Sequence, residues 1–352
     1  MSRKKSYYSL EKLNSTGSTY RLVIGERSNG KSYAVKHYVL EECIKNNKTF
    51  SYIRRYREDI KTNSVLGYFS NVDIKKVTNG EYDSICVYQS EIWLGNQDGL
   101  KVTKERKIGY AHALTMETHY KSIAYEDCDF TIFEEFITDS GYIKDEVTHF
   151  SNLISTLFRR RKNVVCFMVA NTLSRFCPYF SEWKLEEVLR QRQGTILTYE
   201  FDGINLSVEY CQSGDNVESV ILGKNSDMIN SGKWESKRCT LLTQEERKKC
   251  RKWYTMFIQH LSLGYNVEIL TKDKTLSPFL YVYPCNFYNS QADRIIDTSI
   301  NRNYLDKKVT EKFCVITQYD TIVKDLLTQG RITFCNDLTG TEFQSLQKDS
   351  II

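Results

Sequence analysis

The sequence contains little proline and no long hydrophobic run. Three prolines among 352 residues leave no proline-rich linker to mark a domain boundary. The longest uninterrupted apolar segment, residues 164–170, is far shorter than the ~20 residues that cross a bilayer. The first ten residues carry charge without the apolar core of a signal peptide. We therefore expect a soluble protein that stays in the compartment where it is made, with no membrane partner.

Metal-binding and disulfide patterns are absent as well. No two of the 11 cysteines lie within ten residues of each other, which excludes CxxC elements and the ligand spacing of a zinc site. The five histidines do not cluster either. Scattered cysteines within apolar segments are typical of a reducing cytosol, where the thiol packs as a small hydrophobic group.

Composition and length indicate a folded protein of about two domains. Hydrophobic residues make up 41% and charged residues 26% of the chain, which excludes wholesale disorder. The net charge of +5 is too small to identify a partner. Its excess is local, because residues 1–62 hold 14 lysines and arginines against 6 acidic residues. Such a surface suits a phosphate-bearing partner, although most charged segments are simply solvated.

Alternating strands and helices predict the architecture of residues 1–205. Lys31–Asn46 has the periodicity and the residue types of a helix. Turn residues between positions 73 and 115 predict inserted antiparallel hairpins. The alternation favours a three-layered α/β domain with a mostly parallel sheet. Strands are expected at residues 20–24, 49–54, 129–133, 163–170 and 194–201, and a further helix at 145–161.

The rest of the chain predicts a joint and a smaller α+β domain. Residues 206–240 are polar and typical of a linker, and residues 241–352 form the second domain. Thr243 and Glu246 have the spacing of a capping box, so we expect a helix there with Trp253, Phe257 and Leu261 on one face. Its opposite face is either a contact for RNA or protein or a solvated surface. That face holds Arg247, Lys248, Arg251 and Lys252.

The strongest motif lies between the first strand and the first long helix. Glycines allow such a loop to wrap around phosphates, so that backbone N–H groups point at anionic oxygens. Lys31 is expected to reach the β- and γ-phosphates of a nucleotide, and Ser32 to bind Mg²⁺. The alternative is a glycine-rich turn that binds no nucleotide. The motif G-x-x-x-x-G-K-[ST] is matched by Gly25, Glu26, Arg27, Ser28, Asn29, Gly30, Lys31 and Ser32, and we expect the site to continue to Tyr33.

Two carboxylates follow the buried strand at residues 129–133. Glu134 is expected to hold Mg²⁺ through its water shell, and Glu135 to polarise the attacking water as general base. Adjacent carboxylates are also common at solvent-facing strand ends, so the pair gains its meaning from the P-loop upstream.

Other basic residues and one amide are weaker candidates. Arg159, in a basic run at the end of a predicted helix, either balances the helix dipole or acts as an arginine finger on a neighbouring subunit. Asn171 stands at a strand tip where a γ-phosphate sensor would sit. A strand end at residue 54 presents three arginines that could contact the DNA backbone, the nucleotide or a neighbouring subunit. These are Arg54, Arg55 and Arg57.

Several segments resemble the DNA-packaging ATPases of phi29-like bacteriophages. They are VIGERSNGKSYA (23–34), YIRRY (52–56), IFEEF (132–136), TLFR (156–159) and the segment around Asn171, in the same order and at similar spacing. The resemblance covers residues 20–180 and is fainter over 255–350. It implies an ASCE-type P-loop ATPase, RecA-like, which uses ATP and Mg²⁺ and works as a homomeric ring, a pentamer by this resemblance. Such a ring drives double-stranded DNA through the portal of a prohead in the host cytoplasm, with a structural RNA as a further partner.

The same resemblance implies a role for individual residues. Glu135 becomes the catalytic glutamate, Arg159 the finger that acts in trans, and Asn171 the coupling position. Lys121 looks like a second basic residue aimed at nucleotide. One departure is visible, since the family has aspartate where Glu134 stands; we expect altered metal geometry and retained activity.

The resemblance also bears on residues 241–352, which it relates to a degenerate RNase H-like nuclease domain. The aspartates there form no metal motif, so we expect a binding module without nuclease activity. Two alternatives stay open: a complete terminase with an active nuclease, and a nucleotide-dependent assembly switch that does not move DNA.

Overall fold

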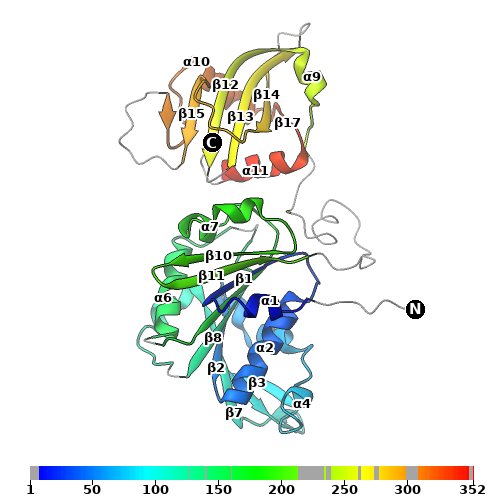
Figure 1. Cartoon of the computed structure of the whole chain (residues 1–352), viewed down its shortest axis with the longest axis vertical. Helices are drawn as coiled ribbons and strands as arrows, with labels where there is room; N and C mark the ends of the chain where they lie inside the picture. The colour runs from blue at the N-terminus through cyan, green and yellow to red at the C-terminus, as the bar shows by residue number, and fades with distance from the viewer. Residues whose placement is uncertain are drawn as a thin grey trace, which may run out of the picture.

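The computed structural model describes residues 8–125, 127–138, 141–159, 161–212, 234, 239–260, 263–272, 277–298, 308–348 and 352. Its two large sheets lie in separate lobes, the N-terminal one below and the C-terminal one above in Figure 1. In the part of the chain that the structure describes, no helix has the length and apolarity to span a membrane.

The N-terminal lobe is built around a nine-stranded sheet of order β10-β11-β1-β9-β8-β2-β7-β4-β3. The six strands from β11 to β7 are parallel, and antiparallel strands extend the sheet at both edges. In chain order its elements are α1 (Glu11–Asn14), β1 (Tyr20–Gly25), α2 (Lys31–Asn46), β2 (Thr49–Arg54), η1 (Arg57–Ile60), α3 (Thr62–Phe69), α4 (Ile74–Val77), β3 (Ser84–Tyr88), β4 (Glu91–Gly95), β5 (Gln97–Asp98), β6 (Lys101–Val102), β7 (Arg106–Ala113), η2 (Leu114–Met116), α5 (Glu117–Tyr120), β8 (Cys128–Glu134), α6 (Glu146–Leu157), β9 (Val165–Asn171), α7 (Pro178–Glu182), η3 (Glu186–Arg190), β10 (Thr195–Phe201) and β11 (Ile204–Tyr210).

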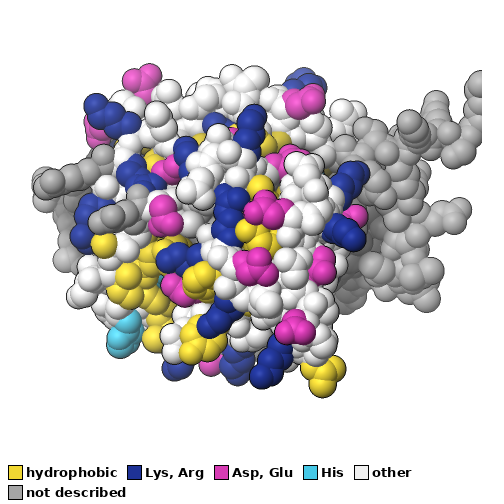
Figure 2. Space-filling model, turned by 90° about the horizontal axis from the view of Figure 1, so that it is seen from below, with side chains coloured by type: hydrophobic (Ala, Val, Ile, Leu, Met, Phe, Trp, Pro, Cys, Tyr) yellow, Lys and Arg dark blue, Asp and Glu magenta, His cyan; other side chains and the backbone are white. Residues whose placement is uncertain are grey.

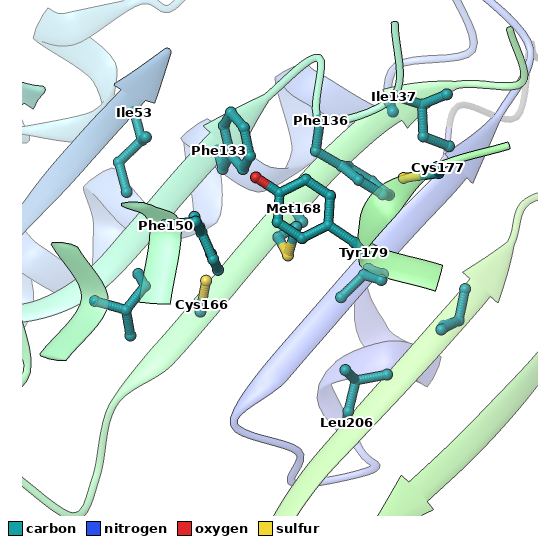
Figure 3. Packing of buried hydrophobic residues seen from close by; sticks show 14 of the residues in the cluster. Ile53, Phe133, Phe136, Ile137, Phe150, Cys166, Met168, Cys177, Tyr179 and Leu206 are labelled. Atoms are coloured by element: carbon teal, nitrogen blue, oxygen red, sulfur yellow. The ribbon is translucent and has the colours of Figure 1, made fainter. Parts of the chain in front are cut away.

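Helices cover both faces of this sheet because its central strands are apolar on both sides. On one face α2 and α3 pack against residues such as Phe50 and Phe167. On the other, α6 and α7 pack against Phe133 and Met168, and Figure 3 shows Tyr179 in this second layer. Strand β9 lies between β1 and β8, the strand order of an ASCE P-loop fold. The predicted three-layered α/β domain is therefore confirmed.

The second lobe contains a six-stranded sheet of order β16-β15-β12-β13-β14-β17. β12 pairs antiparallel with β13 and parallel with β15, and β13 pairs antiparallel with β14. This is the RNase H-like topology that the resemblance implied, with β17 added beside β14. Its elements are α9 (Gln244–Lys248), β12 (Cys250–His260), β13 (Leu263–Lys272), β14 (Phe279–Pro284), β15 (Arg294–Asp297), β16 (Val309–Thr310), α10 (Gln318–Thr328), β17 (Ile332–Phe334) and α11 (Asp337–Lys348).

The segment that follows β9 in the N-terminal lobe contacts the C-terminal lobe. Phe176 is buried in the hydrophobic core of the C-terminal sheet, and its ring lies edge-on to His260 with the centroids 4.9 Å apart. Arg175 forms an ion pair with Glu342 of α11 at 3.1 Å. The coupling candidate Asn171 is thus only four residues from a direct contact between the domains.

The expected helix beyond Thr243 is wrong in its extent. The capping box forms, with Thr243 Oγ1 accepting from the Glu246 amide at 3.2 Å, but α9 ends after five residues. The aromatic and β-branched residues that follow pair with β13 instead, because sheet pairing overrides local helix propensity. Leu261 lies outside the described residues, as does most of the expected linker. The first domain also exceeds the expected boundary at 205, since β11 continues to Tyr210.

Candidate functional site

The P-loop connects the end of β1 to the start of α2, as expected from the motif. Gly30 takes a left-handed conformation with φ of 94°, which favours glycine directly before the helix. Gly25 allows a close approach, because a Cβ there would lie 3.0 Å from the Cβ of Cys211. The loop residues from Arg27 onward line the adjoining cavity, whereas Gly25 and Glu26 are not among its lining residues.

This cavity has a volume of about 1070 Å³. Its lining combines the P-loop with polar and aromatic side chains from α2 and the N-terminal segment, which suits a ligand with both phosphates and a ring system. It is lined by residues 27–32, by Tyr33 and His37 of α2, by Tyr8 and Asn14, and by Asn171.

Lys31 and Asn171 meet at this cavity. The Lys31 Nζ donates to Asn171 Oδ1 at 3.2 Å and to Asn29 Oδ1 at 3.3 Å. Only 5% of Lys31 is exposed, and burial lowers its pKa. In the parallel register Asn171 stands beside Gly25, so the sheet itself brings the amide to the loop. An anionic phosphate here would favour the charged form of the lysine.

Ser32 and Glu134 also lie together. Ser32 Oγ donates to Glu134 Oε2 at 3.1 Å, and the Tyr68 hydroxyl donates to Glu134 Oε1 at 2.9 Å. Burial raises the pKa of Glu134, against the hydrogen bonds from Tyr68 and Ser32. A hydroxyl and a carboxylate beside a phosphate loop are oxygen donors of the kind that Mg²⁺ prefers. These two side chains therefore fit the expected metal.

Glu135 follows at the end of β8 and has a left-handed backbone with φ of 59°. Its side chain is 56% exposed, and its Oε2 accepts from Arg54 Nη2 at 2.7 Å. Arg54, at the end of β2, thus holds the carboxylate that the sequence predicts to be the general base. This guanidinium is engaged with Glu135 rather than presented to DNA.

The other two arginines of the DNA-contact hypothesis differ sharply in exposure. Arg55 is 5% exposed and forms a buried ion pair with Glu146, so it has no surface to offer a DNA backbone. Its predicted contact with DNA is therefore not supported by its position. Arg57 is exposed at the start of η1 and keeps that hypothesis open.

Arg159 and Lys121 lie together, away from the cavity lining. Arg159 is exposed two residues past the end of α6, and its Nη2 donates to the Lys121 carbonyl at 3.4 Å. Lys121 Nζ forms an ion pair with Glu117 at 3.2 Å. Neither Lys121 nor Arg159 is among the residues that line the P-loop cavity of its own chain.

The four basic residues of the C-terminal domain do not share a helix face. Arg247 Nε donates to the buried Glu268 at 2.8 Å, and its guanidinium lies over the Tyr283 ring. Arg251 stacks on the exposed Trp253 with its guanidinium 4.7 Å from the ring centroid. Lys248 and Lys252 are exposed. Lys248, Arg251 and Lys252 are therefore exposed and remain candidates for a contact. Arg247 is instead bound to Glu268 of β13.

The model of the family described as "Podovirus DNA encapsidation protein (Gp16)" matches residues 2–219, more than half of the chain. The chain belongs to this family. The DNA packaging protein of Bacillus phage phi29 is 32% identical over 197 residues, which are 54% of this chain and 53% of the relative. That of Bacillus phage B103 is 34% identical over 177 residues, covering 48% and 49%. The matches thus span about half the length of these curated relatives.

A solved structure supports the fold over nearly the whole chain. The bacteriophage phi29 viral genome packaging motor assembly aligns with a TM-score of 0.58 and 20% identity, covering 98% of this chain and 99% of that one. The family resemblance and the fold class expected from the sequence are both confirmed.

Sequence reasoning missed Tyr68, His37 and the N-terminal wall of the cavity. His37 had a usable signal, since it stands four residues after Tyr33 on the helix that begins at the P-loop. Tyr68 had none, because α3 brings it to Glu134 from 66 residues away in sequence.

Proposed function

We propose that this Gp16-family chain hydrolyses ATP to drive double-stranded DNA into a prohead, as a homomeric ring at the portal. Membership of the family and the relatives that are DNA packaging proteins support this function. The observation that carries it is the convergence of Lys31, Asn171, Ser32, Glu134 and Glu135 at the carboxyl edge of the parallel sheet. Ligands of open α/β sheets bind at that edge.

The binding chemistry follows from the P-loop. Lys31 and the backbone N–H groups at the start of α2 hold the phosphate chain, with the positive end of the helix behind them. Asn171 accepts a hydrogen bond from the same lysine. A change in the phosphates that Lys31 binds would therefore change the hydrogen bond between Lys31 and Asn171. Ser32 and Glu134 would hold Mg²⁺, which would supply positive charge to the phosphates.

Hydrolysis requires Glu135 to accept a proton from the attacking water. In this structure Arg54 donates to Oε2 of that carboxylate, which fixes the position of the base. Arg159, with Lys121 beside it, is exposed for approach to the cavity of a neighbouring subunit. Its positive charge would stabilise the transition state there, which links hydrolysis to assembly.

The nucleic-acid contacts are narrower than the sequence suggested. Arg57 is our candidate for the DNA backbone, and Lys248, Arg251 and Lys252 are candidates for RNA or the portal. A second candidate function, an active nuclease, is not favoured. β12 carries no carboxylate, and Asp297 of β15 stands beside Gln259 in the parallel register. A two-metal nuclease needs converging carboxylates.

The test is ATP turnover and DNA packaging by the purified chain with proheads and double-stranded DNA. Glu135→Gln removes the base while keeping the shape, and should abolish both activities. Glu187→Gln, on the exposed surface of η3, is the matched control and should leave them unchanged. Turnover that does not respond to proheads and DNA would instead identify an ATPase with no packaging role.

A further inference from the structure

Arg55 is buried directly after β2, where a charged residue needs a compensating partner. Its Nε and Nη2 donate to the two carboxylate oxygens of Glu146, both at 2.7 Å. Glu146 is the first residue of α6 and is only 2% exposed. The pair is therefore a bidentate contact in the interior of the domain.

The guanidinium has further partners, and these lie at the catalytic glutamate. Nη1 donates to the backbone carbonyl of Glu135 at 3.0 Å, and Nη2 to that of Phe136 at 3.1 Å. The Glu135 amide donates to the carbonyl of Val169 at 2.8 Å. The backbone is thus fixed on both sides of Glu135.

Such fixing matters because Glu135 has a positive φ. A left-handed conformation costs a non-glycine residue roughly 1–2 kcal/mol and persists only where its surroundings impose it. The direction of the side chain depends on this backbone geometry. Without the two hydrogen bonds from Arg55, Glu135 would gain access to the ordinary conformations, which point the carboxylate elsewhere.

We propose that Arg55 is a positioning residue for hydrolysis, which holds the backbone of Glu135 in its left-handed conformation. The inference rests on the proposed role of Glu135 as base. Arg54 contacts the side chain of Glu135, whereas Arg55 contacts its main chain. The two adjacent arginines therefore have separate tasks.

Glu146 and Tyr179 hold Arg55 in place. Tyr179 is fully buried, and its hydroxyl donates to Glu146 Oε1 at 3.1 Å, while the Ile143 amide donates to Oε2 at 3.1 Å. Figure 3 shows Tyr179 between Phe133, Phe136 and Phe150. Lysine could not replace the arginine, because one ammonium cannot reach the carboxylate and two carbonyls in this forked arrangement.

The experiment compares Arg55→Lys and Tyr179→Phe with a buried control on β2. Ser51→Ala is suitable, since Ser51 is fully buried and its hydroxyl lies 2.7 Å from His112 Nδ1, with no contact to Glu135. For each variant we would measure kcat, KM for ATP, binding of a fluorescent ATP analogue, and Tm. Tyr179→Phe keeps the ring and tests the network where Arg55→Lys fails to fold.

We expect Arg55→Lys to lower kcat by about 100-fold, the scale of a misplacement near 1 Å, with KM and analogue binding unchanged. Tyr179→Phe should lower kcat less, by roughly 3- to 10-fold, through one lost hydrogen bond. Ser51→Ala should lower Tm and leave kcat unchanged.

Two results would overturn the positioning role. One is a wild-type kcat in both Arg55→Lys and Tyr179→Phe. The other is a loss of kcat in these variants that Ser51→Ala shows as well at a comparable loss of Tm. Glu135→Gln separates this failure from that of the proposed function. If Glu135→Gln retains turnover, the assignment of the base is wrong; if it abolishes turnover while the Arg55 and Tyr179 variants are normal, only the positioning role fails.

Discussion

Removal of the Tyr68 hydroxyl should raise the Mg²⁺ concentration that ATP hydrolysis requires. In Tyr68→Phe, Glu134 loses a 2.9 Å hydrogen bond to its Oε1 and retains the contact from Ser32. A hydrogen bond to a charged group contributes about 1.5–3 kcal/mol, which corresponds to about 10- to 150-fold in an equilibrium constant. We expect the lower end, about a tenfold higher half-activating Mg²⁺ concentration, because the hydrogen bond from Ser32 still orients the carboxylate.

The assay is ATP turnover against free Mg²⁺ at saturating ATP, together with direct Mn²⁺ binding measured by electron paramagnetic resonance. Turnover should recover at high Mg²⁺. Glu134→Asp supplies the control, because the shorter carboxylate withdraws from Tyr68 and the second substitution should then add little. An unchanged Mg²⁺ requirement in Tyr68→Phe, or equal effects of that substitution in both backgrounds, would refute the reasoning.

Two further predictions concern the C-terminal domain. Burial lowers the pKa of His260 to about 4, so the unfolded chain takes up a proton below pH 6.5 that the folded chain refuses, and the free energy of unfolding falls between pH 6.5 and 4. His260→Gln should remove up to about 3 kcal/mol of this fall in urea titrations. The slope due to the buried His112 remains, because burial lowers its pKa to about 3. Identical pH dependence in both proteins would contradict the assignment. Neutralising Lys248, Arg251 and Lys252 should reduce the salt dependence of RNA binding by up to three counterions, whereas Arg192→Ala should not, and an unchanged slope would remove these residues as contacts.

The sequence was sufficient for the parts of the site that depend on local pattern. The P-loop and α2 follow from glycine spacing and helical periodicity, and α2 occupies the predicted residues 31–46. Lys31, Ser32, Glu134 and Asn171 come together because the ends of neighbouring parallel strands share one edge.

Burial and long-range strand pairing could not be predicted from the sequence. Three arginines close in sequence look alike, but β2 and the loop that follows it direct them to a carboxylate, to a buried network and to solvent. In the same way a capping box predicted a helix start correctly, and the pairing of β12 with β13 ended that helix after one turn.

The arrangement of charge on the surface could not be predicted from the sequence either. Figure 2 shows the end of the molecule formed by the N-terminal lobe, where lysines and arginines alternate with acidic side chains. The coloured lysines and arginines on this face form no continuous positive surface.

The central claim is that hydrolysis across a subunit interface drives packaging, and mixed rings test it most directly. Arg159→Ala subunits keep the base but lack the finger, and Glu135→Gln subunits keep the finger but lack the base. Each should be inactive alone, with Arg192→Ala as an active surface control. We predict that mixing the two inactive proteins on proheads restores ATP turnover and protects DNA from nuclease. Failure of every mixing ratio to restore turnover, while wild-type subunits assemble normally, would contradict an arginine that acts in trans.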